Sequence, residues 1–428
     1  MSLNTRAAAF LATDAARDSL SRLYGRDEAV LTQQRARYNA LAQRHIELFG
    51  EKDGMRFVSA PGRTEVAGNH TDHNHGRVLA AAVNLDTVAA VTPSDKPVVT
   101  LYSEGYDKPF IVDLNDLEPK KSEYETTDGL IRGVAARMKE LGYVIGGFDA
   151  VVCSTVFKGS GLSSSAAFEV LICAILDSLY NGFVVDAKKR AQIGQYAENV
   201  FFGKPCGLMD QMASSVGGLV AIDFGKADPV VTAMKFDFEA AGYVPAVVSV
   251  GGEHGNLTAD YAAIPAEMKS VAEALGGTVL ADIAPEVMEK AIPQLKNNVK
   301  DRAILRALHF YDENKRVDRL VAALNEADIA TFFEMLIASG ESSWKLLQNL
   351  YVAGSDNEEM PLALELSRRM LEGRGAWRIH GGGFAGTILA FIPADMVAEY
   401  TERMNAVFGK GAVTPLMIRA DGAVQILY

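Results

Sequence analysis

The chain has 428 residues, a length that indicates two or three domains, each large enough to bury its own hydrophobic core. Its composition, 49% hydrophobic and 22% charged, is close to the globular average and excludes a disordered or fibrous chain. Forty-two Lys and Arg against 54 Asp and Glu leave a formal charge of -12, which repels nucleic acid and anionic membrane surfaces. We therefore expect neither among the partners of this protein.

Cysteine usage and the first residues bear on the compartment of the protein. The three cysteines, Cys153, Cys173 and Cys206, show no close pairing such as C-x-x-C. The short apolar run near the N-terminus is soon followed by Asp14 and Arg17, unlike a secretory leader. No apolar stretch approaches the roughly twenty residues that span a bilayer. We expect a reducing, cytoplasmic location and a monomer.

The first half of the chain is predicted to begin with helices and continue with strands. Apolar residues spaced three and four apart, such as Leu31, Tyr38 and Leu41, predict helices over residues 4–50. From Phe57, short β-branched runs separated by Gly, Pro, Asn and Asp predict a sheet. The expected elements are strands at 78–83, 88–91 and 98–102, a helix at 129–141, a strand at 147–155 and a helix at 163–180.

The second half is predicted to be mainly helical, with strands at its beginning and near its end. Helical periodicity covers 262–275, 300–324, 329–338 and 362–372. Strands are expected at 218–224, 244–250, 377–380 and 387–392. The predicted fold class is therefore α/β, with an α+β second half.

A polar stretch at 225–233, in which Pro229 interrupts strand pairing, indicates a domain boundary. We divide the chain there. The predicted parts are an N-terminal helical extension packed on the first domain (1–50), a first domain (51–228) and a second domain (229–428).

A run of small residues, 159–167, falls where a predicted strand turns into a helix. It reads Gly-Ser-Gly-Leu-Ser-Ser-Ser-Ala-Ala, so backbone N–H groups and hydroxyls converge at the positive N-terminus of a helix. Glycine lets a phosphate approach the backbone, and a serine hydroxyl can ligate Mg²⁺. The run predicts a phosphate cradle, with a capped helix and a serine loop as the alternative. It is not a P-loop, since no G-x-x-x-x-G-K-[ST] occurs in the chain.

The segment 60–76 concentrates polar side chains between two predicted apolar strands. It reads Ala-Pro-Gly-Arg-Thr-Glu-Val-Ala-Gly-Asn-His-Thr-Asp-His-Asn-His-Gly. Asp72 can accept two hydrogen bonds and His70 can donate or accept, which suits recognition of the vicinal hydroxyls of a polyol. A polar loop whose Asp and Asn residues cap turns is the alternative.

Four residues of the same segment, His70, Asp72, His73 and His75, also suit a transition metal, because imidazole and carboxylate are ligands of zinc and iron. Their spacing argues against this interpretation, since imidazoles at i, i+3 and i+5 do not share one helical face. The metal site is kept as an alternative with less support.

Two carboxylates, Glu198 and Asp210, punctuate the largely apolar stretch 197–215. One of them can hold Mg²⁺ while the other accepts or orients the proton of an attacking hydroxyl, the two positions that phosphoryl transfer requires. The alternative is that Asp210 caps a helix or pairs with an arginine.

A glycine cluster lies near the C-terminus, at 378–386. Residues 381–386 formally match G-x-G-x-x-G, a pattern typical of dinucleotide sites. Such a site normally opens its domain, and no later βαβ unit is evident here. A glycine turn that approaches bound phosphate, or that supports the other loop, is the better prediction.

These four segments, in this order and at these separations, resemble the galactokinase branch of the GHMP kinases. The segment that ends at Gly76 resembles the signature P-G-R-x-x-x-x-G-x-H-T-D-x-N-x-G, residues 161–166 resemble the phosphate loop G-L-S-S-S-A, and residues 381–386 resemble the third family motif. The resemblance extends from about Tyr38 to the C-terminus. It implies a two-domain α/β fold with the active site in the cleft between the domains.

The resemblance also implies an activity: ATP-dependent phosphorylation of galactose at its anomeric 1-hydroxyl, giving galactose 1-phosphate and ADP, with ATP and Mg²⁺ as cofactors. It places Arg63 and Asp210 at that hydroxyl, Asp210 as base or orienting carboxylate and Arg63 as its partner and charge stabiliser. The implied Mg²⁺ ligands are Ser165 and Glu198. The implied sugar contacts are Asn69, His70, Asp72, the Gly207 backbone and Tyr261. The implied ATP contacts are Gly159, Ser160, Gly161, Leu162, Ser163, Ser164, Ser165 and Ala166.

The chain departs from the family pattern at several positions, among them residue 69 and the residues after Tyr261. Asn69 stands where galactokinases usually carry Glu, a residue that in the family contacts the sugar 6-hydroxyl. A neutral amide accommodates a 6-carboxylate more easily, so galacturonate is an alternative substrate. A sugar sensor without catalysis is a second alternative, although the intact run 163–167 argues against it. Tyr261 is followed by Ala262 and Ala263 where the family commonly has a basic pair.

Overall fold

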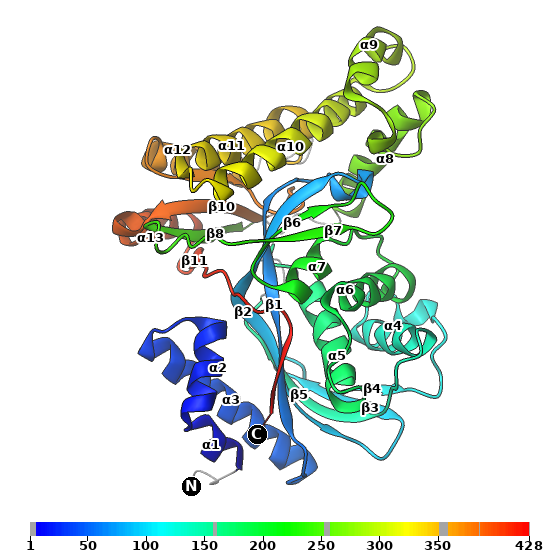
Figure 1. Cartoon of the computed structure of the whole chain (residues 1–428), viewed down its shortest axis with the longest axis vertical. Coiled ribbons are helices and arrows are strands. Elements are labelled where there is room, and N and C mark those ends of the chain that lie inside the picture. The colour runs from blue at the N-terminus through cyan, green and yellow to red at the C-terminus, as the bar shows by residue number, and fades with distance from the viewer. Residues whose placement is uncertain (1–5, 157–160, 252–256, 351–357, 385, 428) are drawn as a thin grey trace.

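Two β-sheets follow one another along the long axis of the molecule, and helices pack against both (Figure 1). The computed structural model describes residues 6–156, 161–251, 257–350, 358–384 and 386–427. Helices and strands alternate along much of the chain, and the predicted α/β class is confirmed.

The N-terminal extension consists of three helices, α1 (Arg6–Leu11), α2 (Asp14–Tyr24) and α3 (Glu28–Phe49), as predicted for this part of the chain. Thr13 and Asp27 cap α2 and α3 by accepting hydrogen bonds from backbone N–H groups of the first turn. Apolar residues of the helices, among them Tyr38, form one buried cluster with Phe57 of the first sheet. The extension therefore covers one face of that sheet.

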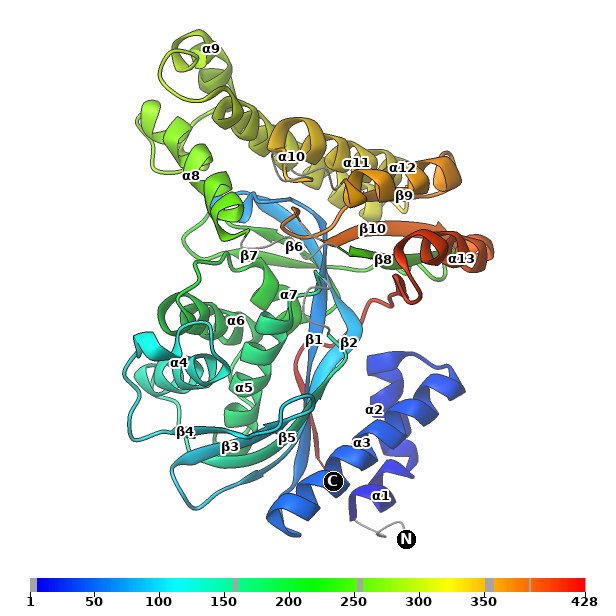
Figure 2. The same cartoon turned by 180° about the vertical axis from the view of Figure 1, so that it is seen from behind.

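The first sheet contains eight strands. In order of pairing they are β12 (Val424–Leu427), β1 (Arg56–Ala67), β2 (Arg77–Pro93), β5 (Phe148–Ser154), β3 (Val98–Ser103) and β4 (Phe110–Asp113), with β6 (Leu219–Asp223) paired to β2 and β7 (Val230–Met234) paired to β6. Only β3 and β5 are parallel among these described pairs. Strand β12 brings the C-terminal end of the chain back beside the N-terminal helices (Figure 2).

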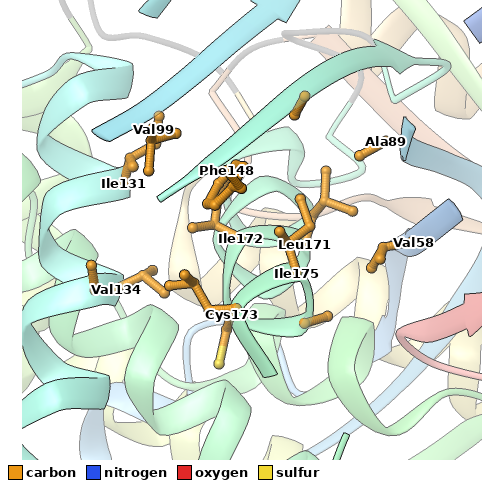
Figure 3. Packing of buried hydrophobic residues seen from close by; sticks show 14 of the residues in the cluster. Val58, Ala89, Val99, Ile131, Val134, Phe148, Leu171, Ile172, Cys173 and Ile175 are labelled. Carbon is orange, nitrogen blue, oxygen red and sulfur yellow. The ribbon is translucent and has the colours of Figure 1, made fainter. Parts of the chain in front are cut away.

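Four helices cover the opposite face of the first sheet (Figure 2). They are α4 (Thr127–Glu140), α5 (Ser164–Tyr180), α6 (Ala187–Tyr196), which continues into the π-helix η3 (Ala197–Phe202), and α7 (Met209–Val216). Figure 3 shows Leu171, Ile172 and Ile175 of α5 in the same buried cluster as Phe148 of β5 and Val134 of α4. This burial fixes the direction of α5, and with it the serine-rich run at the N-terminus of the helix.

The second sheet is antiparallel. Its strands, in order, are β11 (Val413–Pro415), β8 (Tyr243–Gly251), β10 (Gly386–Pro393) and β9 (Ala376–Ile379). The helices of this part are α8 (Thr258–Ala274), α9 (Pro285–Leu295), α10 (Asp301–Asn325), α11 (Ile329–Ser342), α12 (Glu359–Leu371) and α13 (Val397–Phe408). Helices α10 to α12 lie above the sheet in Figure 1. The predicted α+β second half is confirmed.

One prediction about the strands is wrong. The runs 78–83 and 88–91, expected as separate strands, both belong to β2. No turn is needed between them because Asn84 exchanges hydrogen bonds with the backbone of Met417, and Asp86 lies in a buried ion network. The polar stretch 225–233, expected to separate two domains, includes the first residues of β7, which pairs with β6.

The division of the chain into 1–50, 51–228 and 229–428 stays a prediction. Its second boundary falls in the short connection between β6 and β7, whose pairing begins at Asp223 and Val230. In the described part of the chain, none of the helices combines the length and the apolar character needed to cross a bilayer.

The carboxylate of Asp86 ties three distant segments of the chain together. Its Oδ1 accepts from Arg37 of α3 at 2.7 Å, and its Oδ2 accepts from Arg419 at 3.0 Å and from Ser59 of β1 at 2.5 Å. Tyr24 of α2 also donates to Oδ2. Burial alone raises the pKa of Asp86, but the two guanidinium groups outweigh burial and lower it. The N-terminal extension is therefore joined to the C-terminal segment through one ionised side chain.

We predict that Asp86→Asn lowers the free energy of unfolding by about 3–5 kcal/mol, because it leaves two buried guanidinium groups without their counter-charge. Urea denaturation measures this change. The matched control is Asp53→Asn, since Asp53 also pairs with an arginine, Arg6, but its side chain is 91% exposed. The control is expected to stay within about 0.5 kcal/mol of wild type. Equal losses in the two variants would contradict the network.

Candidate active site

A bidentate ion pair joins Arg63 of β1 to Asp210 in the first turn of α7. Arg63 donates from Nε to Asp210 Oδ1 at 2.6 Å and from Nη2 to Oδ2 at 2.7 Å. Burial opposes ionisation of Asp210, but the charge and hydrogen bonds of Arg63 outweigh it and lower the pKa of the carboxyl. The Asp210 side chain keeps 30% of its surface exposed. The result is an ionised carboxylate of fixed orientation that a ligand can reach.

The serine-rich run at the start of α5 meets this pair. Arg63 also donates to the carbonyl of Gly161, and Ser163 Oγ donates to Asp210 Oδ2 at 2.7 Å. Ser163, the residue before α5, has a φ of 58°, in the left-handed region that serine seldom adopts. The described part of the predicted phosphate cradle is thus held against Asp210. Gly159 and Ser160, predicted to belong to the same cradle, lie outside the described residues.

Glu198, in the π-helix, faces Ser165 of α5. Ser165 Oγ donates to Glu198 Oε1 at 3.3 Å, and Gln211 Nε2 donates to Glu198 Oε2 at 2.8 Å. The same amide group donates to the fully buried Glu169 at 3.0 Å. Burial raises the pKa of both glutamates. The predicted pair of Ser165 and Glu198 is therefore brought together, with a hydroxyl and a carboxylate as possible cation ligands.

Three residues predicted to bind sugar each hold one carbonyl of the glycine turn 381–383. In the order of the turn, the donors are Asn69 Nδ2 at 2.6 Å, His70 Nε2 at 2.8 Å and the Tyr261 hydroxyl at 2.6 Å. Since a carbonyl only accepts, His70 carries a proton on Nε2, and burial lowers its pKa to about 4. A Cβ at Gly382 would lie 2.7 Å from the Tyr261 ring. These contacts confirm that the glycine cluster supports the polar segment.

The side chain of Asn69 is fully buried, and its hydrogen-bonding positions are all in use. Besides its bond to the glycine turn, the amide nitrogen donates to Glu65 Oε1 at 2.9 Å. The amide oxygen accepts from Asn349 at 2.8 Å and from Ser343 at 3.3 Å. An asparagine side chain offers two protons and two lone pairs, so none is left for a ligand. The sugar contact expected of Asn69 stays a prediction, and this geometry does not favour it.

Asp72 and Gly207, both predicted to contact sugar, lie against each other. Asp72 opens the short 3₁₀-helix η1 (Asp72–Asn74), and its Oδ1 accepts from the N–H of His73 at 2.9 Å. A Cβ at Gly207 would lie only 1.7 Å from Asp72 Oδ2, so a side chain there would displace the carboxylate. The transition-metal alternative for this segment is not supported, since no set of three or more His, Cys, Asp and Glu residues suited to a metal occurs in the described ranges.

Sequence reasoning missed a layer of polar residues behind the site. Arg378 of β9 donates to Glu65 Oε1 at 3.0 Å, and both side chains are buried. His380 lies between Thr64, at 3.0 Å, and Thr387, at 3.3 Å. The available signal was a run of polar residues, 63–65, at the end of an otherwise apolar strand. Such residues must find partners when the strand is buried.

Comparisons with known proteins identify the fold. The family model described as "Galactokinase galactose-binding signature" matches residues 43–93, and the model "GHMP kinases N terminal domain" matches residues 129–218. Among solved structures, the Lactococcus lactis galactokinase complexed with galactose has a TM-score of 0.80 at 23% identity, over 90% of this chain and 99% of that chain. The Methanococcus jannaschii mevalonate kinase has a TM-score of 0.62 at 14% identity, over 86% and 99%. The fold is therefore that of the GHMP kinases.

Curated relatives show to which family of this fold the chain belongs. A galactokinase of Streptomyces coelicolor is 30% identical over 373 residues, which cover 86% of this chain and 92% of that protein. A galactokinase of Streptococcus suis is 30% identical over 375 residues, with the same coverage of 86% and 92%. The chain belongs to the galactokinase family.

We predict that Gly161→Ala lowers the free energy of unfolding by about 1–3 kcal/mol more than a matched glycine substitution, because overpacking adds to backbone strain. A Cβ at Gly161 would lie 2.5 Å from Thr387 Oγ1 and 2.7 Å from His380 Nδ1. The matched control is Gly182→Ala, whose φ of 73° is close to the 71° of Gly161 but whose Cβ would meet nothing within 4 Å. Urea denaturation of both variants gives the difference, and a difference of zero would show that the packing around Gly161 is loose.

His380 predicts a pH dependence of stability. Burial, aided by the neighbouring Arg63 and Arg378, lowers the pKa of its imidazole well below the usual value, so the folded protein keeps His380 neutral. An unfolded histidine takes up a proton near pH 6.5, and below that pH the unfolded state binds more protons than the folded state. The contribution of His380 to stability is therefore present above about pH 6.5 and is lost on acidification.

The fall in unfolding free energy between pH 7.5 and pH 5.5 is accordingly expected to be about 1 kcal/mol smaller in His380→Gln than in wild type. Denaturant titrations at the two pH values measure this difference. Comparing the variant with wild type cancels the opposite contribution of buried glutamates, which gain stability on acidification. Identical pH dependence in the two proteins would mean that folding does not change the pKa of His380.

Proposed function

We propose that this chain transfers the γ-phosphate of ATP to the anomeric hydroxyl of galactose, forming galactose 1-phosphate and ADP. The observation that carries the proposal is the Arg63–Asp210 ion pair held against the serine-rich run by Ser163. This arrangement puts a fixed carboxylate beside a helix N-terminus that suits phosphate. Galactose is the substrate indicated by the curated relatives, which are galactokinases.

The phosphates of ATP are proposed to lie along the serine-rich run, from Gly159 to Ala166. The described residues of the run precede and open the 17-residue helix α5, whose N-terminus carries partial positive charge and free N–H groups. A glycine at position 161 keeps the backbone close to the His380 and Thr387 layer, since a Cβ there would collide with both. The run is therefore packed against His380 and Thr387, and the N-terminus of α5 favours an anion beside it.

Ser165 and Glu198 are proposed to hold Mg²⁺ together with the nucleotide. Their oxygens lie 3.3 Å apart, and both are hard ligands of the kind that Mg²⁺ prefers. The Glu198 side chain is buried, and a buried ionised carboxylate favours a cation beside it. When bound there, Mg²⁺ supplies charge neutralisation at the phosphate oxygens.

The transfer step follows from the geometry of Arg63 and Asp210. The sugar 1-oxygen attacks the γ-phosphorus, the bond between that phosphorus and the β–γ bridging oxygen breaks, and ADP leaves with the electron pair. Asp210 orients the hydroxyl and receives its proton. Because the pKa of Asp210 is lowered, the carboxylate is a weak base, and it takes the proton late, as the attacking oxygen becomes acidic. Arg63 holds both carboxylate oxygens and stabilises the developing negative charge.

The sugar is proposed to contact His70, Asp72, the Gly207 backbone and Tyr261. Two observations support this proposal: Gly207 lies against Asp72, and His70 and Tyr261 hydrogen-bond to the same glycine turn. We assign Asn69 to positioning this turn. The galacturonate alternative depended on the missing charge at Asn69, a side chain that is here buried and fully bonded, and neither it nor the sugar-sensor alternative is favoured.

A coupled ADP-release assay with Mg²⁺, ATP and a panel of galactose, galacturonate, N-acetylgalactosamine, glucose and arabinose tests this function. Galactose is expected to be turned over fastest. Asp210→Asn is expected to lower kcat by about 10²–10⁴-fold, the range for loss of a group that orients and accepts a proton. Asp228→Asn, an exposed aspartate, serves as control and is expected to match wild type. Binding of galactose by the Asp210 variant in calorimetry verifies that the fold is retained.

Two outcomes would overturn the proposal. Wild-type protein that leaves every sugar of the panel unphosphorylated while still binding one of them would be a sensor. Galacturonate turned over faster than galactose would assign a different substrate to the same site.

A further inference from the structure

A lysine that the site described above does not use stands beside the proposed metal ligand. Lys204 Nζ lies 3.8 Å from Glu198 Oε1, and the lysine side chain is 64% exposed whereas that of Glu198 is 4% exposed. Glu198 Oε1 is the same oxygen that accepts from Ser165, while Oε2 is held by Gln211. Lys204 and Ser165 therefore converge on the one carboxylate oxygen that a cation would take.

The backbone around Lys204 is fixed although its side chain is exposed. The N–H of Lys204 donates to the carbonyl of Glu198 at 3.2 Å, which ties the loop to the π-helix. Two residues further on, the N–H of Cys206 donates to Asn199 Oδ1 at 2.7 Å, and the carbonyl of Cys206 accepts from Gln195 at 3.2 Å. The backbone of Lys204 is thus held by hydrogen bonds in a short loop. Its long side chain is mostly exposed, so it can adopt other rotamers.

Charge explains why an ammonium group is needed at this place. The Glu198 side chain is buried, and the Lys204 ammonium lies beside its Oε1 at 3.8 Å. Arg63, the guanidinium of the site, is committed to Asp210 and to the carbonyl of Gly161. Lys204 therefore supplies the counter-charge that Glu198 has before a metal arrives, and it is held by a single contact.

The ion pair itself contributes little to stability. A pair with one exposed partner is worth roughly 0–1 kcal/mol, because water screens the attraction and the long side chain loses freedom. A lysine in this position is better suited to exchange than to holding the fold. When a divalent cation takes Glu198 Oε1, like-charge repulsion drives the ammonium away from that oxygen. Glu198 Oε1 lies 3.3 Å from Ser165 Oγ in the first turn of α5, so an ammonium that leaves this oxygen is already close to the proposed phosphate site.

We propose that Lys204 is a catalytic residue of this chain that changes partner, from Glu198 before metal binding to a non-bridging phosphate oxygen of the bound nucleotide. The inference rests on the proposed kinase function and extends it. In the first state Lys204 pairs with the buried carboxylate of Glu198, and in the second it adds its positive charge at the nucleotide phosphates, beside that of Arg63. Lys204 thus competes with the metal for Glu198 Oε1. Once the nucleotide is bound, both positive charges act on its phosphates.

Lys204→Met removes the charge and keeps the length of the side chain. Lys269→Met is the matched control, because Lys269 is 62% exposed and pairs with Glu273 at 3.5 Å on α8. Two dissociation constants are measured by calorimetry: that of Mn²⁺ alone, as a probe of the metal site, and that of a non-hydrolysable ATP analogue with Mg²⁺. Thermal unfolding is expected to be unchanged in both variants.

The expected signature has opposite signs in the two titrations. Mn²⁺ alone binds about three- to tenfold more tightly to Lys204→Met, because a screened like charge has been removed. The ATP analogue with Mg²⁺ binds roughly 10- to 100-fold more weakly, the loss that removal of one charge-assisted hydrogen bond gives. Lys269→Met matches wild type in both titrations. A purely structural role would not strengthen one ligand and weaken another.

Failure of this inference can be distinguished from failure of the kinase function. If Lys204→Met matches Lys269→Met in either titration, the exchange is wrong, whatever the turnover of the wild-type protein. Wild-type protein that fails to phosphorylate galactose would refute the proposed function, and the two titrations, which need no turnover, would still decide the role of Lys204.

Discussion

The paired hydrogen bonds between Arg63 and Asp210 are the interaction on which the rest of the site depends. They join β1 to α7, and through Ser163 and the Gly161 carbonyl they also hold the start of α5. The same pair determines the chemistry, because a carboxylate bound in this way is ionised and a weak base. The orienting role with late proton transfer that we propose for Asp210 rests on that geometry. Removal of either side chain would break contacts that hold the serine-rich run as well as the reacting group.

A second constraint comes from the glycine turn, which links the two parts of the fold. Residues 381–383 connect the strands β9 and β10 of the second sheet, yet their carbonyls are held by Asn69, His70 and Tyr261. Asn69 belongs to the polar segment that follows β1 of the first sheet. The polar segment 60–76 is therefore positioned by both sheets, and a change in the second sheet is transmitted to it through these hydrogen bonds.

The sequence predicted the long elements and the grouping of the motifs, but not how they are supported. Short strands such as β4, β11 and β12 have four residues or fewer, too few for periodicity to show, and α9 contains Pro293 within its helix. Pairing of Arg63 with Asp210, 147 positions apart, was implied only by the family resemblance. Glu65 contacts Arg378, and all hydrogen-bonding positions of Asn69 are occupied, only because distant segments pack together in three dimensions. No local sequence pattern predicts such contacts.

The position of the phosphate in the product tests the account most directly. Wild-type protein is incubated with Mg²⁺, ATP and uniformly ¹³C-labelled galactose, and the sugar phosphate is examined by phosphorus and carbon NMR. We expect two-bond coupling between phosphorus and the anomeric carbon, and no phosphate ester on any other carbon of the sugar. A phosphate on the 6-position, or ADP formed without any sugar phosphate, would contradict the placement of the anomeric hydroxyl against Asp210.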